Sequence, residues 1–264
     1  MDAAFAIAVV TWKEWAAYRS HMAVSLVTGP LRFLVMTWIW RSTTSAATGG
    51  QGATESLVLY SGLAVLVGYA VMDFSDWNLQ MLVRTGRYAT QLLYPLPHPW
   101  FSFSQKLGHR FLSLLIEILP VWCLVSLFLG KPLVPCNLGW FLLSVAQGFV
   151  LMFFINYAVG LTGFWLVRAE GVRRGLLVVR DTMSGAWIPL SFFPGAFQSI
   201  LFLSPYTWAM YVPLRIAMGN LEIHGQILSA SLAVALQSVA LLAWGSLALA
   251  ATKFANRRFL AAGG

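Results

Sequence analysis

Charges inside long apolar segments are the feature of this sequence most able to do chemistry. Arg32 lies within the apolar segment 21–40, and Glu117 lies within the apolar segment 109–129. Intramembrane charges are costly and usually face a partner or a cavity. At about 1.5 Å per residue from the ends next to the basic clusters, Arg32 is about 16 Å deep and Glu117 about 12 Å deep. These depths allow a structural pair, and they also allow the two residues to line a substrate path.

Motifs for catalysis, nucleotide binding and metal binding are absent from the sequence. It contains no GxxxxGK[ST] phosphate loop, no HExxH and no GxSxG. Cys123 and Cys136 lack metal-ligand spacing, and the four histidines are scattered. We therefore predict no catalytic residue and no metal site. An intramembrane lipid-modifying enzyme would need polar residues that converge at one depth, and only isolated charges are seen.

The composition places most of the chain in a membrane. The 264 residues are 59% hydrophobic and 10% charged, whereas roughly a quarter of the residues of a soluble domain are charged. The net charge of +8 could suggest nucleic acid as a partner. The cations, however, sit in short clusters between apolar segments, as topology signals do. We therefore expect contact with membrane lipid and none with nucleic acid.

The apolar segments predict a single all-α integral membrane domain, 1–264, with six transmembrane helices. Residues 1–20 are amphipathic and predict an interfacial helix. Most Lys and Arg residues fall on one side of this layout, which places both termini in the cytoplasm. The six predicted spans are 21–40, 56–77, 109–129, 138–167, about 175–192, and 226–252.

A basic connector, residues 84–110, separates the second and third predicted spans. It carries Arg84, Arg87, Lys106 and Arg110 and no acidic residue, so it should lie in the cytoplasm. Its apolar run 88–94 is closed by prolines, which cannot continue a helix. We therefore predict a short helix over 88–94 that docks on a soluble partner.

A second unusual segment, 193–225, precedes the last predicted span. It is apolar but interrupted by prolines and glycines, and its pieces 194–203 and 206–218 are too short to cross a bilayer as continuous helices. Both of its ends fall on the outer side of the layout. The segment should therefore dip into the membrane and return, where protein or a cavity covers it.

This order of elements resembles the permease subunit of type-2 ABC transporters over essentially the whole chain. Two segments are similar to the subgroup often grouped with viologen and multidrug exporters: RTGRYATQLLYPLP, 84–97, and SGAWIPLSFFPGAFQSILFLSPYTWAMYVPLRIAMGN, 184–220. The resemblance implies that the first is a cytoplasmic coupling segment that touches an ATPase. The second would form the external re-entrant helices. The coupling residues so implied are Gly86, Tyr88, Leu92, Leu93, Tyr94 and Pro95, and those of the re-entrant segment are Gly185, Pro189, Pro194, Pro205, Tyr211 and Pro213.

The resemblance also implies a function. The chain would be a permease in a bacterial inner membrane, exporting a hydrophobic or cationic small molecule such as a drug or antibiotic. It would bind no cofactor itself, because ATP and Mg would be used by two partner ATPase subunits. A second, related permease would complete a heterodimer, with a homodimer left open. A non-catalytic membrane assembly factor is the other alternative.

Aromatic residues on the fourth predicted span have two readings. Phe153 and Tyr157 could line an apolar translocation path, together with Arg32 and Glu117. They could instead pack against neighbouring helices or lipid.

Overall fold

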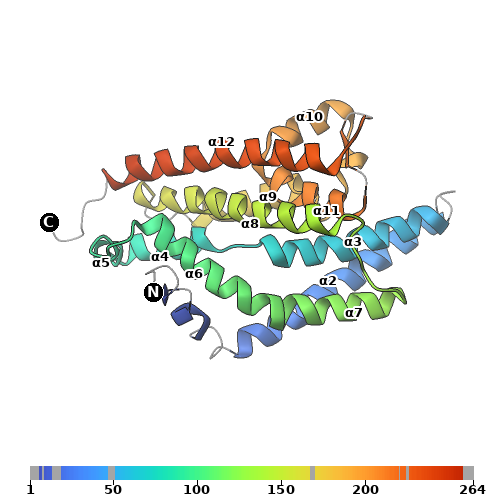
Figure 1. The fold of residues 1–264 in the computed structure, drawn as a ribbon, viewed down its shortest axis with the longest axis horizontal. Coiled ribbons are helices and arrows are strands. Elements are labelled where there is room, and N and C mark those ends of the chain that lie inside the picture. The colour runs from blue at the N-terminus through green and yellow to red at the C-terminus, as the bar shows by residue number, and fades with distance from the viewer. Residues whose placement is uncertain are drawn as a thin grey trace.

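The computed structural model describes residues 6–7, 9–13, 19–46, 51–166, 170–219, 221–223 and 226–257. Most of the predicted interfacial helix, 1–20, therefore lies outside the described residues, although 6–7 and 9–13 are helical. The described chain is all-α apart from one small hairpin. Its longest helices lie side by side along one axis (Figure 1).

Several long apolar helices are candidate membrane spans. In the part of the chain that was searched, four helices are long and apolar enough to cross a bilayer: Gly52–Arg84, His98–Leu129, Leu138–Phe164 and Ala230–Asn256. The first predicted span corresponds to α2 (Arg19–Ala46), which is 28 residues long and contains Pro30. The total of six spans stays a prediction.

The second predicted span, 56–77, is interrupted at residues 72–74, although the two helices on either side run on in one candidate span. The helix α3 (Gln51–Val71) stops, and a separate helix, α4 (Ser75–Arg84), follows. The Asp73 carboxylate turns the chain between them by accepting a hydrogen bond from the Ser75 amide at 2.9 Å. Such local side-chain bonds compete with helix continuation.

The basic connector is also more helical than predicted. The helix α5 covers only Tyr88–Gln91, so it is shorter than the predicted helix over 88–94. The helix α6 (His98–Ser113) then begins inside the connector. It continues through a π-helical turn, η1 (Leu114–Ile118), into α7 (Leu119–Leu129). The stretch 98–110 is therefore the start of a long helix, because Pro99 falls in its first turn, where proline is tolerated.

The fifth predicted span is not a continuous helix of membrane length. The helix α9 (Glu170–Met183) has 14 residues, or about 21 Å at 1.5 Å per residue, against about 30 Å of hydrocarbon. Gly185 then adopts a left-handed backbone with φ 68°, which ends helical geometry at little cost for glycine. A 3₁₀ turn, η3 (Leu190–Phe192), follows Pro189.

Short elements replace a long helix between α9 and the last span. They are α10 (Gly195–Leu203), the π-helical turn η4 (Thr207–Tyr211), α11 (Val212–Ala217) and the strands β1 (Leu221–Ile223) and β2 (Gln226–Leu228). The strands pair antiparallel, with Leu221 opposite Leu228. The last helix, α12 (Ala230–Asn256), therefore starts four residues later than predicted, where Ser229 caps it by accepting from the Leu232 amide.

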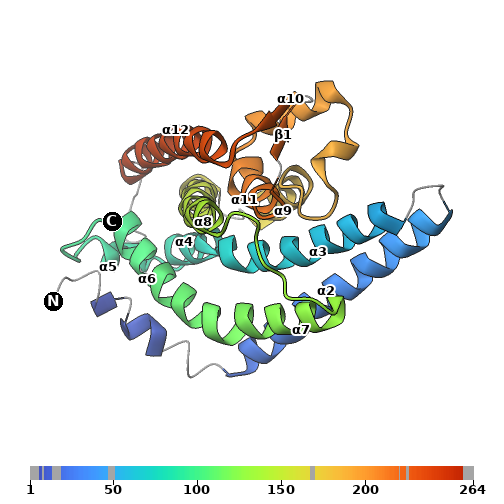
Figure 2. The same ribbon diagram turned by 45° about the vertical axis from the view of Figure 1, so that its right-hand side comes forward.

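The helix α8 (Leu138–Leu161) lies at the centre of the bundle, with α12, α4, α3 and α11 packed around it (Figure 2). Gly148 allows the closest approach, since a Cβ there would meet the Ala209 carbonyl oxygen at 2.3 Å. The helices α4 and α5 lie at one end of the bundle, and α10 and α11 lie toward the other (Figure 1). The predicted coupling and re-entrant segments are thus far apart.

Candidate functional site

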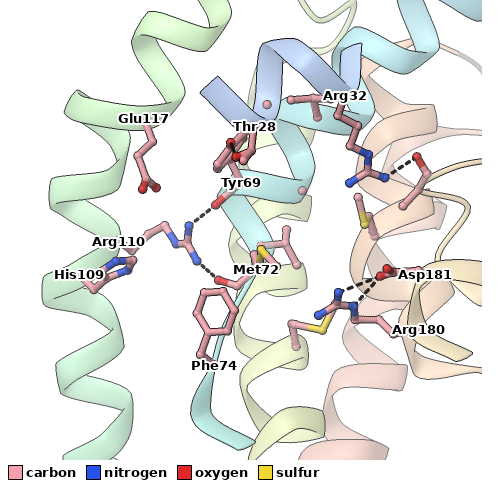
Figure 3. Close-up of a pocket in the computed structure, with 17 residues that line it drawn as sticks. Thr28, Arg32, Tyr69, Met72, Phe74, His109, Arg110, Glu117, Arg180 and Asp181 are labelled. Carbon is pink, nitrogen blue, oxygen red and sulfur yellow. Dashed lines mark hydrogen bonds and ion pairs between the residues drawn. The ribbon is translucent and has the colours of Figure 1, made fainter. Parts of the chain in front are cut away.

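A cavity of about 330 Å³ lies between α2, α3, the α6–η1 helix and α9 (Figure 3). Pockets for small molecules span roughly 300–1,000 Å³, so this one could hold a small ligand or part of a larger one. Five charged residues line it. Arg110 and Glu117 lie on the α6–η1 side, whereas Arg32, Arg180 and Asp181 lie on the other (Figure 3).

Arg110 holds the broken end of α3. Its guanidinium donates to the backbone carbonyls of Tyr69 and Met72 (Figure 3). The last carbonyls of a helix have no partner within the helix, and a cation near them also interacts favourably with the helix dipole. Arg110 interacts electrostatically with Asp73 and Glu117 as well. Its charge therefore serves the α3 end and two neighbouring carboxylates.

Glu117 is buried, and its carboxylate accepts a hydrogen bond from the Ser113 hydroxyl. In the described part of the chain it forms no ion pair with Arg32. The two residues instead line the same cavity from opposite sides (Figure 3). The pair that their depths allowed is not formed, and their role in a substrate path stays a prediction.

Arg32 is fixed by groups from the segment that follows α9. Its Nη2 donates to the Ala186 carbonyl at 3.0 Å. Its guanidinium carbon lies 4.3 Å from the centre of the Trp187 ring, a cation–π geometry. Arg180, nearby, donates through Nε to Asp181 Oδ1 at 2.9 Å.

Apolar side chains make up most of the remaining lining. Met152 comes from α8, Met210 from η4, and Met72 from the α3–α4 break, with Val65 and Phe74 beside them. Methionine is unbranched and polarisable, so it adapts to apolar ligands of varied shape. The cavity thus combines charged residues on two sides with adaptable apolar side chains. Among the described residues, no group of three or more His, Cys, Asp and Glu could hold a metal ion.

Two buried ion pairs fix the α3–α4 break to other helices. Lys106 of α6 lies 3.6 Å from Asp73 Oδ1, and Arg173 of α9 donates to Asp76 Oδ2 at 2.7 Å. The Asn156 amide of α8 donates to the Asp73 carbonyl at 2.9 Å. The helices α6, α8 and α9 are thereby all bonded to residues 73–76 at the break.

The predicted coupling segment has a buried base and an exposed tip. Tyr88 is fully buried, while Leu92 is 52% exposed, Leu93 85% and Tyr94 51%. Gly86 precedes α5 with φ 72°, a left-handed conformation that favours glycine. Three exposed apolar side chains at the end of the bundle form a candidate docking surface.

Tyr88 joins this segment to the bundle. Its hydroxyl donates to Asn256 Oδ1 at the end of α12, at 2.7 Å. Its ring lies edge-on to Phe164, with centroids 5.0 Å apart, and beside His98 at 5.1 Å. Burial raises the pKa of Tyr88 to about 12, so its hydroxyl keeps its proton at physiological pH. A displacement of the tip should therefore reach α12 and the end of α8.

Tyr88→Phe should weaken this junction without removing its packing. The ring contacts stay, while the hydroxyl loses at least its hydrogen bond to Asn256, which costs about 1 kcal/mol. We expect the apparent unfolding temperature of the detergent-solubilised protein to fall by roughly 2–4 °C. Thermal unfolding followed by tryptophan fluorescence measures this. A fall as large as that of Tyr88→Ala would show that packing depends on the hydroxyl, contrary to this assignment.

Phe153 and Tyr157 do not line the cavity. Both are buried in an aromatic cluster of α8 with Phe103 and Tyr88. The Tyr157 hydroxyl lies 2.7 Å from His98 Nδ1. Their placement favours packing over a path-lining role. The spacing of these residues could not distinguish packing from path lining, because a buried face and a path-lining face of a helix have the same periodicity.

The predicted re-entrant residues shape the turns of the 184–217 segment. Tyr60 of α3 donates to the Gly185 carbonyl, and Tyr211 packs closely against Gly185. Thr207 donates to the Met183 carbonyl at 2.8 Å and to that of Leu201 at 2.6 Å. The prolines begin the short elements: Pro189 precedes η3, Pro194 precedes α10, Pro205 precedes η4, and Pro213 lies in the first turn of α11.

Sequence reasoning missed Arg110 and Arg180 as cavity residues. Both lie near the ends of apolar segments and were counted as topology charges. The orientation of each side chain depends on its contacts, with α3 for Arg110 and with Asp181 for Arg180. Nothing in a single sequence indicates that orientation.

Comparison with known proteins yields one match. The family model described as "ABC-2 family transporter protein" matches residues 27–258. This range begins within α2 and includes the predicted coupling segment, the cavity-lining residues and α12. No curated protein and no solved structure matches the chain.

Proposed function

The chain belongs to the ABC-2 family of transporter proteins, and on that premise we propose that it is the membrane permease of an ATP-driven exporter. The sequence has no phosphate loop, and permeases of this family typically lack a nucleotide site. ATP and Mg would then be used by two ATPase subunits on other chains. Energy would reach the permease through a protein–protein contact.

One observation carries the coupling part of this proposal: an exposed apolar tip stands on a buried base. Leu92 and Leu93 are exposed, while Tyr88, four residues earlier, is enclosed and bonded to the end of α12. A docking surface with such a base can pass a displacement into the bundle. The tip and the cavity are linked through the α3–α4 break, where Asp73 and Asp76 hold α6 and α9.

The cavity supports export of a small molecule with substantial apolar surface. Met152, Met210 and Phe74 offer contacts to such a cargo. The expected cationic cargo finds less support, because both carboxylates in the lining have partners. Glu117 accepts from Ser113 and interacts with Arg110, and Asp181 pairs with Arg180.

We propose further that the chain works in a bacterial inner membrane with both termini in the cytoplasm, in a dimer with a second permease. The 184–217 segment would face the outer side, since α10 and α11 lie toward the end of the bundle opposite α5 (Figure 1). Exposed apolar side chains along α2, α7 and α12 suit contact with lipid or with the second permease.

Co-purification tests this function. An affinity-tagged chain, expressed in its own host and cross-linked before solubilisation, should bring down an ATPase subunit identified by mass spectrometry. Membrane vesicles containing the complex should then move an apolar fluorescent cargo only when ATP is supplied. Recovery without any nucleotide-hydrolysing partner, together with transport that ignores ATP, would contradict the proposal.

A further inference from the structure

The charges around the cavity are unevenly balanced. On the α6–η1 side, the two cations Arg110 and Lys106 are matched by two carboxylates, Asp73 and Glu117. On the other side, Arg32 and Arg180 lie near one lining carboxylate, that of Asp181 (Figure 3). Asp181 is bonded to Arg180. In the described part of the chain, no carboxylate lies within ion-pair distance of Arg32.

A cation held in this way inside an apolar bundle needs an anion. Burying a charge without a counter-charge is costly. Arg32 is partly buried and lies within α2, so it cannot be treated as an ordinary surface arginine. A bound ligand that carries an anionic group could therefore neutralise the excess positive charge at Arg32.

Arg32 is also oriented in advance for binding. One N–H of its guanidinium is used by the Ala186 carbonyl, and the ring of Trp187 supports one face. A guanidinium has five N–H donors in a rigid fork, so most of them remain for a ligand. That fork matches carboxylate and phosphate oxygens, which a lysine ammonium would bind only as a point charge.

The rest of the lining requires an apolar ligand body. Met72, Met152 and Met210 form an adaptable apolar surface, and Phe74 extends it. An inorganic anion would leave this surface unused. A neutral apolar molecule would leave the charge of Arg32 without an anion.

We propose that the cavity binds an amphiphile with one anionic group, held by Arg32 and Arg180, and with its apolar body against the methionine side chains of the lining. This inference rests on the proposed function for its meaning in transport, where the amphiphile would be the cargo. The binding itself needs no ATPase.

The test uses the full-length chain in nanodiscs of zwitterionic phosphatidylcholine. Three probes are titrated by calorimetry against filled and empty nanodiscs: octyl phosphate, octyltrimethylammonium and inorganic phosphate. We expect octyl phosphate to bind at least about tenfold more tightly than either other probe, since the others lack one of the two kinds of contact. Equal binding of the two octyl compounds would overturn the anionic assignment. Equal binding of octyl phosphate and inorganic phosphate would overturn the amphiphile.

Variants of one helix supply the matched comparison. Arg32→Gln should weaken octyl phosphate binding about tenfold, and Arg32→Lys by less, because it keeps the charge but loses the fork. Arg41→Gln, on the same helix, removes an arginine that lies over Phe128 outside the cavity and should leave binding unchanged. Unchanged binding in both Arg32 variants would refute the site. If Arg32→Gln does not fold, the difference between Arg32→Lys and Arg41→Gln decides.

The outcome is separable from that of the proposed function. Selective octyl phosphate binding by a chain that recruits no ATPase would support the site and contradict the permease role. A chain that supports ATP-driven transport but binds both octyl compounds equally would support the permease role and contradict the anionic site.

Discussion

Arg110→Gln should be among the most destabilising substitutions in the described part of the chain. The guanidinium donates to the carbonyls of Tyr69 and Met72 at the end of α3 and offsets the carboxylates of Asp73 and Glu117. Hydrogen bonds that involve a charged group contribute about 1.5–3 kcal/mol each, and a buried charge left without its partner adds to the loss. We expect a loss of about 3 kcal/mol or more, with an apparent unfolding temperature roughly 6–12 °C lower.

Thermal unfolding of the detergent-solubilised chain measures this loss. Arg84→Gln is the matched control, because Arg84 is exposed at the end of α4 and contacts only the Met81 sulfur in the described chain. It should shift stability by no more than about 0.5 kcal/mol. Arg110→Lys should recover part of the loss, since it restores the charge but not the two-pronged geometry. Equal temperatures for Arg110→Gln and Arg84→Gln would show that the α3 end does not depend on Arg110.

This arginine also shows where sequence reasoning reached its limit for the fold. Long apolar runs predicted the membrane-length segments in which α3, α8 and α12 lie. A helix that crosses lipid requires such a run. The end of α3 was misplaced, since it is fixed by a side chain about 40 residues further along the chain. The end of α9 was misplaced for a related reason. Gly185 stops the helix in a conformation that Tyr60 and Tyr211 hold from other elements.

The site was predicted in part. Arg32 and Glu117 stood out because a charge is rare in an apolar segment, and the structure places both at one cavity. Arg180 did not stand out, because an arginine near a segment end is also the ordinary mark of topology. Pro95 and Pro97 indicated that a short helix ends in the connector. They could not indicate which residues of that helix are buried. The contrast between Tyr88 and Leu93 comes from packing against α8 and α12.

Leu93→Glu should abolish coupling while leaving the permease folded. The side chain is 85% exposed, so an added carboxylate there stays in water and changes stability by no more than about 0.5 kcal/mol. In the proposed complex the same position lies against an ATPase subunit. Loss of a central apolar contact, with a charge placed in the interface, costs at least about 2 kcal/mol, or roughly 30-fold in affinity. ATP-driven export should fall at least as far.

Two measurements separate coupling from folding. Recovery of the ATPase with the tagged chain and ATP-dependent export from vesicles should both drop in Leu93→Glu, while its insertion and unfolding temperature match those of the unmodified chain. Val134→Glu places the same charge on an exposed apolar residue of the connector 130–137, which follows α7 at the end of the bundle away from α5 (Figure 1). It should retain export, as should Leu93→Met. In the proposed mechanism Tyr88 passes motion from the tip to α12. Full export by Leu93→Glu would therefore place the ATPase contact elsewhere and leave the buried base of this segment without a coupling role.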